Sequence, residues 1–357
     1  RQMPTEAKRF TTVDRLWRKV MAATEAKPNV LLATGQEGLF DNFKEANRLL
    51  ELVQKGLNDY LEKKRLSFAR LFFLSNDELL QILSETKDPL RVQPHLKKCF
   101  EGINTLDFDE NKIIRGMVSV EKEKVPFLTP IDPAQANGMV EKWLLQVEYS
   151  MKKAISDQTY ASHADYTTNK GGRVQWALDW PGMVVLLIGQ VYWTREAEHA
   201  LNSNGHKGLA AYEAKCSQQL DDVVAFVRKP GLTKLGRATL GAMVTLDVHG
   251  RDVLTMMVAN GVDSTIDFNW MAQLRIYYDG DRAPTTKLGD GTETRDTYIK
   301  IIAATAKYGY EYLGNSFRLV VTQLTDRCYR TLMGAIQLVL GGAPEGPAGT
   351  GKTETTK

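Results

Sequence analysis

Eight residues near the carboxyl end of the sequence have the types and the spacing of a phosphate-binding loop. In such a loop glycines let the backbone curl, so that its N–H groups converge on phosphate oxygens. A lysine places positive charge against the β- and γ-phosphates, and the following hydroxyl binds Mg²⁺. The motif G-x-x-x-x-G-K-T therefore predicts binding of ATP or ADP with Mg²⁺, with Thr353 as the metal ligand. Its residues are Gly346, Pro347, Ala348, Gly349, Thr350, Gly351, Lys352 and Thr353.

The sequence around this motif supports a nucleotide site in part. Glu354 and the residues after it are predicted to open the helix whose amino terminus faces the phosphates. A glycine-rich turn without a ligand is the alternative, although a chance match in a chain of this length has odds of about 1 in 100. Upstream, Thr325 is predicted to cap a helix that ends at Gly341. Only residues 342–345 then remain for a strand, which is short for such a loop.

Other groups needed for phosphoryl transfer are missing from the sequence. The reaction requires an acidic partner for Mg²⁺, a group that positions water and often an arginine finger. Only residues 354–357 follow the motif in the sequence, and the chain starts with Arg1 rather than Met. We therefore expect both ends to be cut, the missing groups to lie outside this segment, and the segment alone to turn over no ATP.

Composition favours a folded chain and excludes several classes. Of 357 residues, 43% are hydrophobic and 25% are charged, as in globular proteins. The net charge is only +3, so no basic face for nucleic acid is indicated. Cys99, Cys216 and Cys328 lie far apart, which argues against disulfides or zinc and favours a reducing compartment. The most apolar stretch, residues 183–189, is too short to cross a membrane, and no signal peptide is evident, so we expect a soluble intracellular protein.

Most of the chain has helical periodicity. Apolar residues from Leu39 to Tyr60 alternate at steps of four and three, so they form a seam along one face of a helix. Such a seam fits a coiled coil or one member of a helical bundle. We favour the bundle because Leu49 and Leu52 widen the apolar stripe. Residues 75–78 form a capping box at a second helix start. Further helices are predicted from Asp132-Pro133 to Ala154, from Ala210 to Arg228 and from Leu235 to Ala259.

Strand signals are few. Residues 112–120 and 124–128 flank the polar turn 121–123 and predict a short hairpin. Residues 274–278 predict another strand, and the polar, glycine-containing residues 285–294 predict a mobile loop. The sequence thus predicts a mainly α protein with small β insertions.

Other candidate sites are weaker. The five histidines lack metal-binding spacing, so a metal site is disfavoured. Asp247 and His249, close to Arg251, lie on a helical stretch, where a buried hydrogen-bonded cluster is favoured over catalysis because no nucleophile is recognisable. Apolar packing is predicted for Trp176, Trp180 and Trp193.

Several blocks together resemble dynein heavy chains, at the linker region running into the P-loop of the first AAA module. The P-loop ending looks more like axonemal than cytoplasmic members. The family usually has proline at the positions of Phe317 and Gln323, so this chain departs from the family pattern at the adenine-side loop. The blocks are residues 73–80, 92–100, 181–185, 245–249, 310–314 and 324–329, together with the P-loop ending itself.

This resemblance implies an architecture. Residues 1–315 would form an elongated linker of helical bundles, with a β-hairpin near residues 112–128. Residues 316–357 would begin an α/β P-loop AAA+ module. The segment Leu319–Leu324 would lie near the adenine, so that Leu324, like Glu354 after the motif, joins the P-loop residues as a cofactor contact. Because Pro126, Pro130 and Pro133 crowd together, we also consider that segment as a hinge between bundles.

The resemblance also implies a motor. ATP binding and hydrolysis at the first AAA module would bend and straighten the linker. Expected partners are the remaining AAA+ ring of the same chain, dynein intermediate and light chains, and a microtubule bound through a distant stalk outside this segment. No nucleic acid or membrane is expected. The expected location is the cytoskeleton, in the axoneme of a cilium or flagellum, with the cytoplasm as the alternative.

Two other functions stay open. A compact helical NTPase would use Lys352 without other chain segments, but it would need an apolar strand ending in acidic residues, which is not evident. A helical adaptor or interaction domain would carry the P-loop as a vestige, and its nucleotide affinity would not depend on Lys352.

Overall fold

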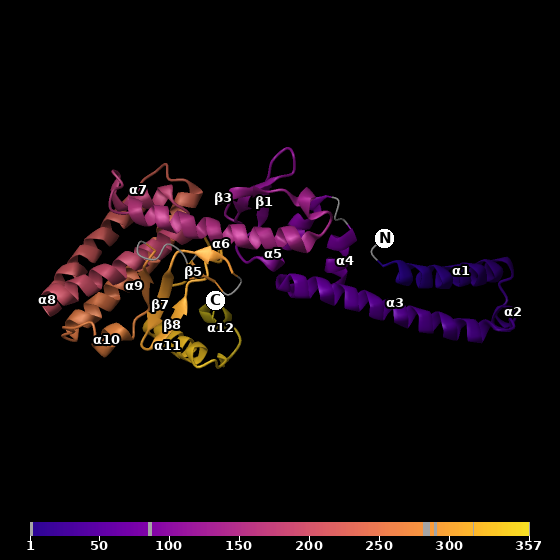
Figure 1. The fold of residues 1–357 in the computed structure, drawn as a ribbon. Coiled ribbons are helices and arrows are strands. Elements are labelled where there is room, and N and C mark those ends of the chain that lie inside the picture. Colours follow the sequence, from indigo (N-terminus) through magenta and orange to yellow (C-terminus); the bar gives the residue numbers. More distant parts are fainter. Residues whose placement is uncertain (1–2, 85–87, 281–285, 289–290, 317, 357) are drawn as a thin grey trace. The chain divides into compact units, whose positions relative to one another are not determined.

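The computed structural model describes residues 3–84, 88–280, 286–288, 291–316 and 318–356. These residues form helices with small antiparallel sheets between them, so the predicted mainly α fold is confirmed (Figure 1). The chain divides into two compact units, which are described separately. Unit 1 comprises Arg1–Asp88 with Met139–Lys142, and unit 2 comprises Pro89–Gly138 with Trp143–Lys357.

Unit 1 is built around a pair of antiparallel helices. The ring of Trp17 lies 6.4 Å from that of Phe43, and near the other end Glu6 lies against Gly56. In the longer helix of this pair, α3 (Leu39–Ser67), only Ala46 and Leu61 are buried. The predicted apolar seam therefore packs on one partner helix, and over only part of its length. The helices are α1 (Pro4–Ala26), α2 (Val30–Thr34), α3 (Leu39–Ser67) and α4 (Asn76–Ser84), with a 3₁₀ turn at Ala69–Phe73.

The predicted capping box at the start of α4 is confirmed. The carboxylate of Glu78 accepts a hydrogen bond from the backbone N–H of Ser75, at 3.0 Å. The Ser75 hydroxyl in turn accepts one from the backbone N–H of Glu78, at 3.3 Å. This reciprocal pair satisfies two amides and fixes the first residue of the helix.

The first sheet of unit 2 contains the predicted hairpin. The hairpin strands are β2 (Ile114–Val118) and β3 (Lys124–Ile131), and β1 (Thr105–Phe108) adds an edge strand that the sequence did not reveal. The order is β1-β2-β3, with all neighbours antiparallel. Before this sheet lie a 3₁₀ turn at Pro89–Val92 and α5 (Gln93–Cys99).

The helix start predicted at Asp132-Pro133 is wrong by several residues. Asp132 does accept a hydrogen bond from the N–H of Ala134, but it caps only a 3₁₀ turn, Pro133–Ala136. Asn137 and Gly138 then have φ values of 51° and 79°, which a helix does not tolerate. The long helix α6 therefore spans Val140–Asp165. Two of the hinge prolines, Pro126 and Pro130, lie within β3 rather than in an interruption.

Two long helices form much of the core of unit 2. The predicted helix at Ala210–Arg228 is the second half of α8 (Gly182–Val227), which is interrupted at Asn204 and Gly205. The predicted helix at Leu235–Ala259 is confirmed as α9 (Lys234–Ala259). Shorter helices flank this pair: α7 (Gly172–Asp179) and α10 (Phe268–Met271). Among the fully buried side chains are Trp176, Leu209, Leu254, Met257 and Trp270.

A second sheet follows α10. Its strands are β4 (Arg275–Tyr278), β7 (Thr297–Ile301) and β8 (Ala304–Lys307), in the antiparallel order β4-β7-β8, and β4 confirms the strand predicted at 274–278. Within the predicted mobile loop, β5 (Thr286–Lys287) pairs with β6 (Glu293–Thr294), so these four residues are ordered in a short ladder. Residues 285 and 289–290 of that loop lie outside the described residues. No described helix combines the length and the apolar composition that a membrane span requires.

Candidate functional site

The helix that leads toward the P-loop begins and ends earlier than predicted. α11 spans Gln323–Gln337, and its cap is Thr322 rather than Thr325. Thr325 is instead the second residue of the capping box, since its hydroxyl accepts a hydrogen bond from the N–H of Thr322 at 2.8 Å. The helix ends before Gly341, and residues 342–345 form no strand. The P-loop is thus joined to α11 by irregular chain.

Three glycines give the predicted P-loop its shape. Gly346, Gly349 and Gly351 have φ values of 152°, 78° and 78°, a region that other residues rarely adopt. A Cβ atom on Gly349 or Gly351 would meet no atom within 4 Å, so open space lies over this part of the loop. The chain then enters α12 (Lys352–Thr356). Local backbone geometry therefore agrees with the role that the motif predicts for its glycines.

Lys352 folds back over the loop that precedes it. Its Nζ donates hydrogen bonds to the carbonyl oxygens of Gly346, at 2.8 Å, and of Pro347, at 2.6 Å. The hydroxyl of Thr350 also donates to the carbonyl of Pro347, at 2.9 Å. The ammonium group is thus held at the mouth of the curled backbone, where the motif requires a positive charge.

The four residues after Lys352 differ in whether their side chains bond to the backbone or are exposed to solvent. The hydroxyls of Thr355 and Thr356 donate to the carbonyls of Gly351 and Lys352, at 3.0 and 2.9 Å. The side chains of Thr353 and Glu354 are exposed, as are Pro347, Ala348 and the glycines of the loop. An exposed hydroxyl directly after the lysine, together with a lysine amine and open glycines, forms a donor set that fits a Mg²⁺–nucleotide.

The predicted adenine contact lies on α11, apart from the loop in sequence. Leu324 is in the first turn of this helix and is 71% exposed, and Leu319 and Val320 just before it are 55% and 69% exposed. Exposed apolar side chains of this kind suit the face of a purine ring, and their contact with adenine stays a prediction.

Asp247 and His249 belong to separate contacts, not to a catalytic group. Asp247 accepts two hydrogen bonds of 2.7 Å from the guanidinium of Arg173, a partner that no sequence pattern predicts. Burial opposes the charge on Arg173, but the hydrogen bonds and charge of Asp247 outweigh it, so the pKa of the guanidinium lies above its usual range. His249 faces Asp326 of α11, with Nε2 and Oδ1 3.4 Å apart. Among the described residues no group of three His, Cys, Asp or Glu side chains is placed to hold a metal.

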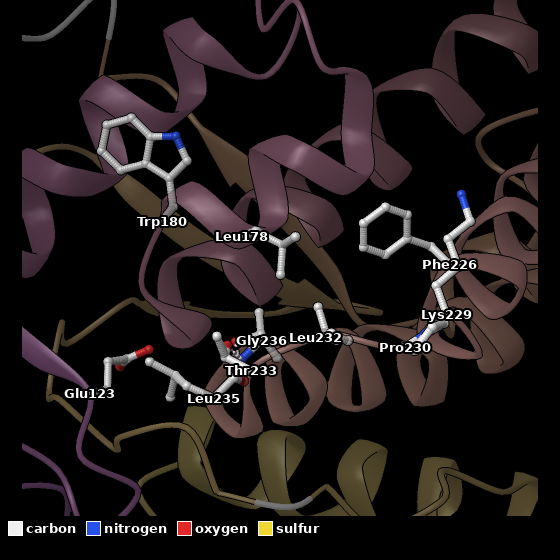
Figure 2. Close-up of a pocket in the computed structure, with 12 residues that line it drawn as sticks. Glu123, Leu178, Trp180, Phe226, Lys229, Pro230, Leu232, Thr233, Leu235 and Gly236 are labelled. Carbon is white, nitrogen blue, oxygen red and sulfur yellow. Dashed lines mark hydrogen bonds between the residues drawn. The ribbon is translucent and has the colours of Figure 1, made fainter.

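A cavity of about 480 Å³ lies elsewhere in unit 2 (Figure 2). Figure 2 shows Glu123 at one end, and Phe226 and Lys229 at the other. Its lining comes from the end of α7, the connection between α8 and α9 and the first turns of α9. No described P-loop residue lines this cavity, so it is separate from the candidate nucleotide site.

Two protein-family models match this chain, one at its amino-terminal part and one at the P-loop end. Residues 1–162 match the family model described as "Dynein heavy chain, N-terminal region 2". Residues 308–357, which include α11 and the P-loop, match the model described as "Hydrolytic ATP binding site of dynein motor region". The chain belongs to the dynein heavy chain family. The family resemblance carried by the sequence blocks is thereby confirmed.

Similar dynein heavy chains align along the whole of this chain. It is 52% identical to "Dynein axonemal heavy chain 12" of Rattus norvegicus over 100% of its own length and 11% of that protein. It is 51% identical to "Dynein axonemal heavy chain 3" and 46% identical to "Dynein axonemal heavy chain 1" of Mus musculus, in each case over 100% of this chain and 8% of the relative. The chain therefore spans about a tenth of the length of these dynein heavy chains.

Proposed function

We propose that this chain is the mechanical linker and the first ATP-binding loop of an axonemal dynein-type microtubule motor. Residues 1–315 form the linker, and residues 316–357 begin the first AAA+ module. ATP binding and hydrolysis at that module bend and straighten the linker. The match of residues 308–357 to a hydrolytic ATP-binding site supports this assignment, as does the position of the Lys352 amine over the loop.

In this proposal the P-loop residues bind and the rest of the parent chain completes the site. The Lys352 amine exchanges the carbonyls of Gly346 and Pro347 for β- and γ-phosphate oxygens, and the Thr353 hydroxyl binds Mg²⁺. Leu324 contacts the adenine. Bound Mg²⁺ would offset the negative charge of the phosphates. Groups that position water and complete the charge stabilisation come from outside this segment, so the segment alone does not hydrolyse ATP.

The proposed partners follow from the same assignment. They are the remaining AAA+ ring of the heavy chain, dynein intermediate and light chains, and a microtubule that the motor contacts through a stalk outside this segment. The names of the relatives favour the axoneme of a cilium or flagellum as the location.

The test is the Lys352→Ala change in the full heavy chain. We expect it to abolish microtubule-stimulated ATPase activity and microtubule gliding, because the loop loses the charge that binds the phosphates. Lys207→Ala is a matched control, since Lys207 is an exposed lysine within α8. Gliding that persists in Lys352→Ala would refute the assignment, and unchanged nucleotide affinity would favour an adaptor with a vestigial loop.

A further inference from the structure

α11 packs on the rest of unit 2 through one side of the helix only. No residue of this helix is buried, but one side of it is half-buried. The half-buried positions follow helical spacing, and the helix lies beside β7 and β8 (Figure 1). They include Asp326, Tyr329, Arg330 and Met333. A helix held in this way rests on the surface of the unit and can shift without opening the core.

One end of α11 is held by α9. The ring Nε2 of His249 lies 3.4 Å from Oδ1 of Asp326, and the two side chains are 23% and 18% exposed. Burial raises the pKa of the Asp326 carboxyl, while His249 and the neighbouring Arg330 oppose the rise. Because Asp326 is in the first turn, its negative charge also suits the amino terminus of the helix.

The other end of α11 is held by the second sheet. The side-chain oxygen of Gln337 accepts a hydrogen bond from the backbone N–H of Thr305, at 2.9 Å. Thr305 belongs to β8, which is an edge strand in the order β4-β7-β8. Residues 326 and 337 are separated by about 16 Å along a helix, so the two contacts hold opposite ends of α11.

The chain just before α11 is fastened much more deeply. Tyr312 and Asn315 are 0% and 3% exposed. The Tyr312 hydroxyl donates to the carboxylate of Glu123 at 2.7 Å, and the side-chain amide of Asn315 donates to the hydroxyl of Thr239 at 2.6 Å. Tyr310, Tyr312 and Asn315 thus belong to the core of unit 2, whereas α11 is joined to it by polar contacts at its two ends.

We propose that the His249–Asp326 and Thr305–Gln337 contacts are the joint that couples the P-loop to the linker. This inference rests on the proposed function, since a short irregular segment is all that separates α11 from the P-loop. His249 and Asp326 act as positioning residues: they hold α11 in register with α9, and neither contacts nucleotide. When the joint is open, α11 moves with the P-loop while residues 310–315 stay in the linker, so nucleotide binding no longer moves the linker.

The experiment compares His249→Ala, Asp326→Ala and the double variant in the full heavy chain. Each single change should lower the gliding velocity at least about fivefold, the lower range of allosteric coupling, and leave mant-ADP affinity and ATPase rate within about twofold. The double variant should be no slower than the slower single variant, because both changes open the same joint.

Two matched variants separate coupling from general damage. His249→Gln keeps an N–H donor toward Asp326 and should restore most of the velocity. Arg327→Ala alters an exposed residue on the same helix and should behave as wild type. Normal velocity in both alanine variants would overturn the proposal, as would a parallel loss of mant-ADP affinity. If Lys352→Ala abolishes ATPase and gliding while the joint variants change nothing, the proposed function stands and only this inference fails.

Discussion

The carboxylate of Glu123 accepts a hydrogen bond from the hydroxyl of Tyr312 at 2.7 Å, although the two residues are 189 positions apart. Its other oxygen accepts the backbone N–H of Gly182 at the same distance, at the first residue of α8. Glu123 is only 4% exposed and sits beside the turn between β2 and β3. This one carboxylate therefore joins the hairpin, the start of α8 and the segment that leads to α11.

Removal of the Glu123 carboxylate should destabilise unit 2. In Glu123→Ala the N–H of Gly182 and the hydroxyl of Tyr312 lose their acceptor within a buried site, at a cost of about 2–4 kcal/mol. Urea-induced unfolding measures this cost, and hydrogen exchange at the Gly182 amide should accelerate. A loss below the cost of an ordinary exposed substitution, about 0.5 kcal/mol, would show that these hydrogen bonds contribute little.

The same carboxyl should make stability depend on pH. Burial raises the pKa of Glu123 above its ordinary value of 4.5, and the hydrogen bonds from Gly182 and Tyr312 oppose that rise. The folded state thus binds the proton more readily than the unfolded state. The stability that the protonated Glu123 carboxyl contributes to the folded state is therefore fully present below pH 4.5. This stability is lost as the pH rises through the pKa of Glu123 in the folded state.

Glu123→Gln isolates this pH term. The glutamine keeps the shape of the side chain, and the Tyr312 hydroxyl can reorient to accept from its amide. Relative to Glu123→Gln, the free energy of unfolding of the wild type should fall as the pH is raised from 4 to about 8. Parallel pH profiles of the two proteins would contradict the raised pKa.

The interruption of α8 should depend on glycine at position 205. Gly205 has a φ of 53°, and a Cβ there would come within 1.9 Å of the Asp263 carboxylate, whose oxygen accepts the N–H of His206 at 2.7 Å. Gly205→Ala should therefore lower the unfolding free energy by about 1–3 kcal/mol. Gly241→Ala in α9 is the control: its Cβ would meet no atom within 4 Å, and it should stabilise by about 0.5–1 kcal/mol. Equal effects of the two changes would argue against the strain.

Features whose residues lie close together in the sequence could be predicted from it, whereas contacts between residues far apart in the sequence could not. The P-loop and the capping box at Ser75 were predictable because their residues lie within eight positions of one another and their spacing carries the chemistry. The position of Glu123 was not, since a glutamate after Glu121 and Lys122 in a polar turn is typical of an exposed surface. Its partners, Gly182 and Tyr312, are brought to it only by the fold.

Element boundaries failed for local reasons. The helix predicted at Asp132 required Asn137 and Gly138 to continue in helical geometry, and both adopt positive φ. The cap predicted at Thr325 lies at Thr322, because two threonines three residues apart satisfy each other in a capping box. Hydrophobic periodicity places the body of such helices but not the residue at which the backbone leaves them.

The hydroxyl that follows Lys352 should determine the Mg²⁺ dependence of nucleotide binding. Thr353 is exposed, whereas Thr356 donates its hydroxyl to the Lys352 carbonyl at 2.9 Å. In the full heavy chain, Thr353→Ala should raise the Mg²⁺ concentration needed for half-maximal ATPase at least about tenfold, because loss of a residue that merely supports a metal ligand already costs about 10–100-fold. Thr356→Ala is the matched control and should leave it unchanged. An equal response of the two variants would refute Thr353 as the ligand.

The central claim is that nucleotide at the P-loop moves the linker, and fluorescence energy transfer tests it most directly. One dye is placed at Val120, an exposed residue after β2, and the other on the AAA+ ring of the full heavy chain. We predict that ATP changes the transfer efficiency in the wild type and in Lys207→Ala, and that Lys352→Ala abolishes the change. A response to ATP that persists in Lys352→Ala would contradict the account.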